Sequence, residues 1–273
     1  MKHSLVKPRA PRRMGKLDRG SGIAHVDFRD TDTPHTPFRR GATSRGARVV
    51  KARVVCSAIG MTALTYAALY LSVGRKPCLS WGASPEDFER TMPGDEWLAN
   101  PDLLSTRAVS IDAPPSAIWP WLVQMGSGRG GVYTYDWIEN LFGLHMHSSD
   151  EILPQFQDRK VGDVEQLGSN GPRLRIDVLD VERAMVLHSE DGNWVWAFCL
   201  YPSSAGSTTL VSRNRIAAPN ASLLTRAFNV LIMEPGSLVM ERKMLLGIKQ
   251  RAEKLARRGV QEVGSTSTSS NGG

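Results

Sequence analysis

The stretch SIDAPPSAIWPWLVQMG, residues 110–126, joins a predicted strand to a predicted helix. Residues 105–111 place Val109 and Ile111 on one face of a strand, because side chains alternate along extended backbone. The turn residues at 112–115 then stop this strand. From Ser116 to Met125 large apolar residues recur at helical spacing, so we expect an amphipathic helix whose apolar side packs on a core.

The rest of the chain continues this α+β pattern. A second short helix is predicted around 136–142, and a long helix around 237–258 follows the last strand. Between these helices lie short β runs separated by Gly, Asn, Pro and Ser turns: 161–167, 174–182, 184–189, 194–201 and 208–216. Residues 75–104 form a proline-rich connector, in which Ser84 caps a short helix that has Pro85 at its first position. We expect one domain at 105–258 and a disordered tail at 259–273.

This order of elements resembles the SRPBCC superfamily, which includes START lipid-transfer domains, plant pathogenesis-related allergens and polyketide cyclases. The stretch 110–126 is similar to the superfamily's first strand and helix. Four further motifs are similar to a membrane-anchored bacterial subgroup of unassigned function: WGASPEDFERTMPGDEW (81–97), GRGGVYTYDWIENLFGL (128–144), KVGDVEQLG (160–168) and MERKMLLGIKQRAE (240–253). The resemblance covers about residues 81–256. It implies a helix-grip fold, in which a curved antiparallel sheet surrounds a long C-terminal helix and leaves an apolar ligand cavity between them.

Positive charge is concentrated at the start of the chain. The net charge is +7, but residues 1–53 contain 14 Lys and Arg against 4 Asp and Glu, while residues 75–273 contain 20 against 23. A basic segment without hydrophobic periodicity predicts a disordered tail at 1–53. This tail has no interleaved aromatic residues and leads into an apolar stretch, so we expect no nucleic-acid partner.

Residues 54–74, VVCSAIGMTALTYAALYLSVG, carry no charge. A helix of this length, at about 1.5 Å per residue, spans about 30 Å, the thickness of a bilayer core. We interpret it as a single membrane-spanning helix; a core helix and a cleaved signal peptide are the alternatives. The basic tail predicts a cytoplasmic N-terminus and a domain outside the cell membrane. In that compartment Cys78 and Cys199 are able to form a disulfide, although buried free thiols are the usual outcome.

Glu241 on the terminal helix lies within an apolar stripe formed by Leu238, Leu245, Ile248, Ala252 and Leu255. A carboxylate that faces an apolar interior has to be paired, hydrogen-bonded or protonated. Glu241 is therefore a cavity acid, and the one candidate catalytic residue, or the partner of a strand arginine such as Arg213 or Arg215, or simply exposed near the start of the helix. These two arginines share one sheet face. They bind an anionic ligand group if that face lines the cavity, and are solvated if it does not.

Other residues are candidates for ligand binding. The loop GSGRGG (126–131) follows a helix, so it is not a phosphate loop, and its four glycines predict a mobile lid. Arg129 lies at its tip, and two tyrosines follow that either hydrogen-bond a ligand or stabilise the lid. Tryptophans either line the cavity or simply pack in the core. The full set of candidates is Trp119, Arg129, Tyr133, Tyr135, Trp137, Trp196, Arg213, Arg215 and Glu241.

Metal and cofactor chemistry is not expected. His145 and His147 have no third ligand nearby in sequence, and no cysteine spacing fits a structural zinc site. We therefore expect a membrane-anchored module that binds a hydrophobic small molecule or lipid in the cavity. The alternative is a cyclase- or dehydratase-like enzyme that uses Glu241 as acid or base. A third hypothesis is a structural membrane protein, which a filled interior would favour.

Overall fold

A computed structural model describes residues 43–141, 143–168 and 171–269. The chain divides into two compact units, Met1–Val55 and Cys56–Gly273. In the first unit, the described residues from Thr43 onward are helical, and residues 1–42 of the basic tail lie outside the described residues. The expectation of a disordered tail up to residue 53 is therefore wrong at its end. Residues 43–53 contain no proline, so an adjoining helix propagates into them at little cost.

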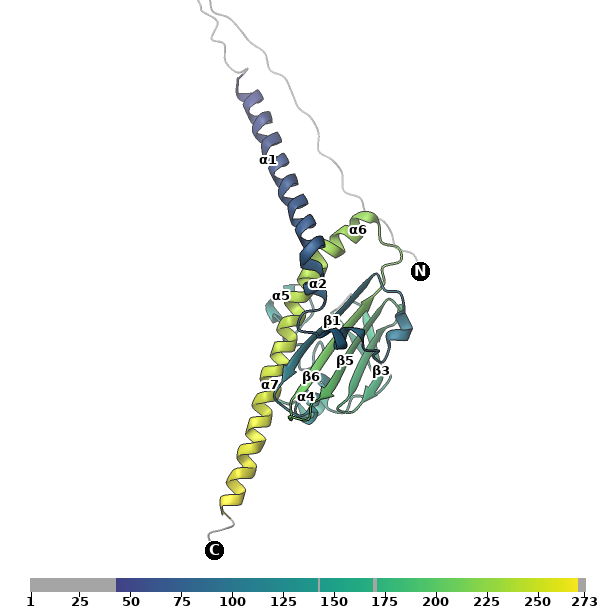
Figure 1. The fold of residues 1–273 in the computed structure, drawn as a ribbon, viewed down its shortest axis with the longest axis vertical. Helices are drawn as coiled ribbons and strands as arrows, with labels where there is room; N and C mark the ends of the chain where they lie inside the picture. The colour runs from purple at the N-terminus through teal and green to yellow at the C-terminus, as the bar shows by residue number, and fades with distance from the viewer. Residues whose placement is uncertain (1–42, 142, 169–170, 270–273) are drawn as a thin grey trace, which may run out of the picture. The chain divides into compact units, whose positions relative to one another are not determined.

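Six antiparallel strands form one sheet in the second unit, in the order β1-β6-β5-β4-β3-β2 (Figure 1). Their bounds are Leu103–Ile111, Val164–Gln166, Arg173–Asp180, Ala184–Ser189, Trp194–Pro202 and Thr208–Ile216 for β1 to β6. The first strand pairs with the last strand along its full length. The long helix α7, Glu234–Ser269, packs on β1 and on α4, Pro115–Val123. The predicted α+β helix-grip fold is confirmed.

The face of the sheet toward α7 carries the main core. Phe198 and Leu210 are fully buried there with Leu245 and Ile248 of α7. Burying a side chain of this size contributes about 1.5–3 kcal/mol, so this apolar stripe is the main force holding α7 on the sheet. Two short helices, α5 (Asp136–Leu141) and the 3₁₀ turn η3 (Pro154–Phe156), lie in the long connection between α4 and β2.

The opposite face of the sheet is covered by the connector. The short helix α3, Pro85–Glu89, starts at the predicted cap Ser84, which forms a capping box with Asp87. The 3₁₀ turn η2, Asp95–Leu98, follows. Between them Met92 packs in a second core with Val186 and Val211. Both Cys78 and Cys199 are buried free thiols, so the disulfide is not formed.

One helical stretch, Lys51–Leu79, is long and apolar enough to cross a membrane by length and composition. It begins within α1 (Thr43–Leu69) and continues through the π-helical turn η1 (Tyr70–Gly74) and α2 (Arg75–Leu79). A second continuous helix begins earlier than predicted, with α6 (Leu223–Phe228) and the π-helical turn η4 (Asn229–Met233) preceding α7. Residues 259–269, predicted to be disordered, are the helical end of α7, because they continue a helix that is already formed.

Candidate functional site

The predicted cavity acid, Glu241, is ion-paired with Arg107 of β1. Both side chains are buried. Arg107 also donates from Nε to the Cys78 carbonyl at 3.1 Å and from Nη2 to Ser237 Oγ at 3.0 Å. The alternative that Glu241 forms a salt bridge with a strand arginine therefore agrees with the structure. Its partner, however, is Arg107 of β1 and neither of the predicted arginines, Arg213 and Arg215.

Two polar side chains of β6 complete the environment of the Glu241 carboxylate. Its Oε1 accepts hydrogen bonds from Ser212 at 2.6 Å and Asn214 at 3.2 Å. The indoles of Trp196 and Trp194 in turn donate to Ser212 Oγ and Asn214 Oδ1, at 3.0 and 2.8 Å. Burial raises the pKa of Glu241 above its ordinary value, and the Arg107 charge opposes this shift. Both carboxylate oxygens are engaged within the protein.

Buried side chains of the sheet and of α7 pack together in the main core. The cavity bounded by Met125, Leu174, Leu187 and Trp196 has a volume of about 20 Å³, which is room for about one water molecule and far too small for an organic ligand. Side chains of the main core pack where the ligand cavity was expected, and the larger cavities of the described residues lie elsewhere. Trp196, a predicted cavity residue, packs between Trp194 and Phe198, with ring centroids 5.6 and 4.8 Å away.

Arg213 and Arg215 share one face of β6, as predicted, but it is the face away from Glu241. Alternation along the strand places them with Val211 under the connector, and Ser212 and Asn214 toward α7. Arg213 is buried and donates to the Asp87 and Phe88 carbonyls at 2.9 Å. Both arginines pair with Asp95, at 2.6 and 3.3 Å. They fasten the connector to the sheet.

The glycine-rich loop, predicted to be a mobile lid, is folded tightly on itself in the structure. Gly126 and Gly131 exchange backbone hydrogen bonds of 3.0 and 3.2 Å. Gly126 has a φ of 135°, and a Cβ at this position would lie 2.3 Å from Oε1 of Glu165. Arg129 donates to the Phe156 carbonyl at 2.9 Å. The glycines here allow close packing of backbone against neighbouring groups.

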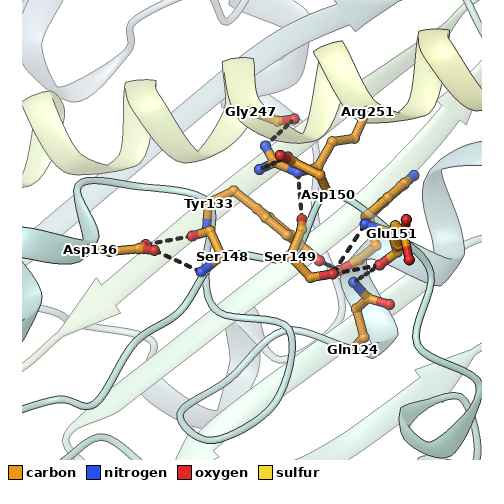
Figure 2. Close-up of polar contacts among 10 residues, drawn as sticks. Gln124, Tyr133, Asp136, Ser148, Ser149, Asp150, Glu151, Gly247 and Arg251 are labelled. Atoms are coloured by element: carbon orange, nitrogen blue, oxygen red, sulfur yellow. Dashed lines mark hydrogen bonds and ion pairs between the residues drawn. The ribbon is translucent and has the colours of Figure 1, made fainter.

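Figure 2 shows how the adjoining segment is fastened to α7. Arg251 of α7 donates to the Ser149 carbonyl at 2.8 Å and to Asp150 Oδ1 at 2.6 Å. Its guanidinium lies 4.7 Å from the centroid of the Tyr133 ring. The Tyr133 hydroxyl is buried and donates to the Trp121 carbonyl at 2.9 Å. This hydroxyl is therefore already used inside the protein, and the cluster is a structural clamp.

The remaining predicted ligand residues lie apart from one another. Trp119 is buried in α4, and Trp137 is 67% exposed on α5. Tyr135 is half-buried, with the ammonium of Lys243 5.8 Å from its ring centroid. Their part in ligand binding stays a prediction, since none of the three lines any of the five main cavities of the described residues.

An apolar pocket lies elsewhere, at the end of the sheet where β1 begins and β6 ends. Its volume is about 300 Å³, at the lower end of the range for small-molecule sites. The apolar part of its wall consists of Leu103, Ile216, Ala218, Val230 and Met233. We call this cavity the η4 pocket, because η4 supplies three of its lining residues. This pocket was not predicted, although the apolar run LLTRAFNVLIM at 223–233 is visible in the sequence.

The charged side chains of the η4 pocket are paired. Asp102 binds Arg226, and it also accepts a hydrogen bond of 2.7 Å from the Ala218 amide. These two donors, the Ala218 amide foremost, hold the pKa of Asp102 below its ordinary value. Glu234 pairs with Arg75 at 2.8 Å. The pocket is therefore an apolar site with a neutralised polar rim.

Comparisons with protein-family models and with curated proteins gave no match. Among solved structures, protein MLL2253 from Mesorhizobium loti is 16% identical, with 55% of this chain and 97% of that chain covered and a TM-score of 0.32. The Polyketide_cyc-like protein Cgl2372 from Corynebacterium glutamicum is also 16% identical, with 63% and 96% covered and a TM-score of 0.28. The KanY protein (ms6282) is 15% identical, with 55% and 97% covered and a TM-score of 0.37. The helix-grip assignment rests on the strand order and on the packing of α7.

Proposed function

We propose that this protein is a membrane-anchored module that binds an uncharged hydrophobic molecule, such as a neutral lipid, beside the bilayer. The observation that carries the proposal is the η4 pocket, an apolar cavity of about 300 Å³. A larger groove of about 590 Å³ beside α2 and α3 is a weaker candidate. Lys76 and Glu89 are among its lining residues, so its surface is more polar.

The charges around the η4 pocket favour an uncharged ligand. Asp102 and Glu234 are each paired with an arginine, so no lone cation in the described lining is available to hold an anionic headgroup. Breaking either pair to bind an anion would leave a carboxylate without its partner. The Asn229 carboxamide, which makes no hydrogen bond to another described residue, is suited to a ligand hydroxyl or carbonyl.

The anchor in this proposal is the apolar helix of residues 54–74. Its large side chains point outward: Ile59, Met61, Leu64 and Leu69 are each more than 60% exposed. A helix with such a surface is stable in lipid and costly in water. The basic charge before it favours a cytoplasmic N-terminus and a domain on the outer side of the membrane.

We do not propose a catalytic role for Glu241. Its carboxylate is fully paired with Arg107, Ser212 and Asn214, and Glu241 lines neither the η4 pocket nor the groove beside α2 and α3. A general acid or base has to come within hydrogen-bond reach of the substrate proton that it transfers. Both oxygens of this carboxylate are already engaged by protein donors, so neither is free to exchange a proton with a substrate.

The proposal is tested by photolabelling the full-length protein in phospholipid nanodiscs. The probes are a diazirine-bearing dodecanol and the dodecanoate of the same chain length. We expect the alcohol to label peptides containing Leu103 and Val230 more strongly than the carboxylate does. Ile216→Trp, which fills the η4 pocket, should abolish this labelling but leave labelling of α1 by membrane-dissolved probe intact.

Val239→Trp is the matched control, since it adds the same indole at a position that is 53% exposed and outside the pocket lining. This variant should label like the wild type. Labelling of Leu103 that persists in Ile216→Trp would contradict binding in the η4 pocket. Equal labelling by the two probes would contradict the preference for an uncharged ligand.

A further inference from the structure

We infer that α6 and η4 form a second membrane contact, with their exposed apolar side chains in the boundary between headgroups and acyl chains. This inference rests on the proposed membrane span of residues 54–74. We call the contacting residues the apolar strip. They are Leu223, Leu224, Phe228, Ile232 and Met233, and their exposed fractions are 87, 81, 52, 53 and 54%.

The composition of this strip suits lipid better than water. Five large apolar side chains are more than half exposed within eleven residues, which is unusual for a surface that faces solvent. The one charged residue between Leu223 and Met233 is Arg226, and its guanidinium is paired with Asp102. The strip therefore presents apolar groups without exposing an unpaired charge between them.

Contacts with the apolar helix fix the depth of the strip. The Tyr66 hydroxyl donates to the Leu231 carbonyl at 2.8 Å, and the Tyr70 hydroxyl donates to Glu234 at 2.9 Å. Tyr66 precedes Gly74, the end of the predicted span, by eight residues, which is about 12 Å along a helix. If residues 54–74 cross the bilayer, η4 therefore lies within the same leaflet.

The occupant of the strip is the bilayer because the strip continues the lipid-facing surface of α1. Leu64 and Leu69 on α1 are 71% and 62% exposed. They lie on either side, in sequence, of Tyr66, whose hydroxyl donates to the Leu231 carbonyl of η4. In Figure 1, α6 and the end of α1 lie beyond the same end of the sheet. A second copy of the chain would have to displace lipid from both surfaces to cover the strip.

This placement also defines the route of the ligand. Val230 and Met233 belong to the membrane-contacting segment and line the η4 pocket. A hydrophobic ligand thus enters from the acyl region without crossing water, and its concentration at the pocket is set by partition into the bilayer. Aqueous delivery is not required.

The test places one environment-sensitive NBD fluorophore at a time on the full-length protein in phosphatidylcholine–phosphatidylglycerol vesicles with brominated acyl chains. Native Cys56, which is exposed, reports on the span itself. Leu224→Cys and Ile232→Cys, each with Cys56→Ser, report on the strip. Val181→Cys with Cys56→Ser is the control, because Val181 is 64% exposed at the opposite end of the sheet. The buried Cys78 and Cys199 should not react, and Cys56→Ser alone checks this.

We expect brominated lipid to lower the NBD emission about twofold at the strip positions and at Cys56, as for groups buried some 5–10 Å into the interface. The emission of the Val181→Cys control should not change. Quenching at Cys56 with none at both strip positions would overturn this inference and leave the anchor standing. No quenching at Cys56 would overturn the anchor and this inference together. Three results together would assign the strip to a second chain. The strip probes would be protected from iodide in solution, they would not be quenched by brominated lipid, and they would show energy transfer between copies.

Discussion

Glu241 of α7 and Arg107 of β1 form a buried ion pair that joins the terminal helix to the first strand. Ser212 and Asn214 of β6 bind the same carboxylate, so the pair lies where β1, β6 and α7 meet. Glu241, which was predicted as a candidate acid or base, therefore holds β1, β6 and α7 together. The ligand pocket that we propose lies at the end of the sheet instead.

The first prediction concerns this ion pair. Arg107→Met should lower the free energy of unfolding by about 3–5 kcal/mol, because it leaves the Glu241 charge buried without its partner. The measurement is urea unfolding of the full-length protein in detergent micelles, followed by near-UV circular dichroism. The double variant Arg107→Met/Glu241→Met should recover much of the loss, since both buried charges are then removed.

Arg173 supplies the control for this prediction, because it forms a surface pair with Glu190 at 2.7 Å in which both side chains are more than 40% exposed. Arg173→Met should change the free energy of unfolding by less than about 1 kcal/mol. Equal effects of Arg107→Met and Arg173→Met would show that the buried pair does not stabilise the domain.

A second prediction concerns Gly247, where α7 passes the Tyr133 backbone. In a helix interior alanine is favoured over glycine by about 1 kcal/mol. At Gly247, however, a Cβ would lie 2.8 Å from the Tyr133 carbonyl oxygen and 2.9 Å from its Cβ. Gly247→Ala should therefore destabilise the protein by about 1–3 kcal/mol through overpacking.

Gly236 on the same helix is the matched position, since a Cβ there meets no other atom within 4 Å. Gly236→Ala should leave the stability unchanged or raise it by up to about 1 kcal/mol. Thermal unfolding of both variants in the same detergent measures the difference. A rise in Tm for Gly247→Ala would disprove the close contact between α7 and the segment at Tyr133.

A third prediction concerns pH and the rim of the η4 pocket. The pKa of Asp102 is lowered by the Ala218 amide and by Arg226, so its ionised form is favoured in the folded state. This stabilisation is present above the ordinary Asp pKa of about 4 and is lost as the pH falls through the lowered value in the folded state. The difference in unfolding free energy between wild type and Asp102→Asn should therefore be present at neutral pH and shrink in acid.

The same comparison defines the opposing result for Asp102. Other carboxyl groups titrate in both proteins and largely cancel in the difference, so urea unfolding at a series of pH values isolates this one group. A difference that stays constant from neutral to strongly acidic pH would mean that the Asp102 charge makes no contribution to holding α6 on the sheet.

Much of the fold could be predicted from local pattern. The strand at 105–111, the Ser84 cap and the inward direction of Glu241 follow from alternation, capping chemistry and helical spacing. Arg107 shares strand parity with Val109 and Ile111, so its inward direction was also readable. Its pairing with Glu241 was not, because residues 134 positions apart meet only through the packing of α7 on β1.

The proposed ligand site could not be predicted for two physical reasons. The free volume between the sheet and α7 is the small difference between the space that the backbone encloses and the volume of the side chains inside it. The sequence therefore does not reveal that Phe198, Leu210 and their neighbours pack into this space. The η4 pocket borders Asn229–Met233, a π-helical turn that shifts the phase of the helical repeat. A search for a regular period therefore does not identify this segment.

The most direct test of the account measures binding of tritiated dodecanol to the full-length protein in nanodiscs by scintillation proximity. We predict one saturable site per chain above the partition into empty nanodiscs, present in wild type and Val239→Trp and absent in Ile216→Trp. Binding that does not exceed empty nanodiscs, or that is unchanged by Ile216→Trp, would contradict a ligand site beneath η4.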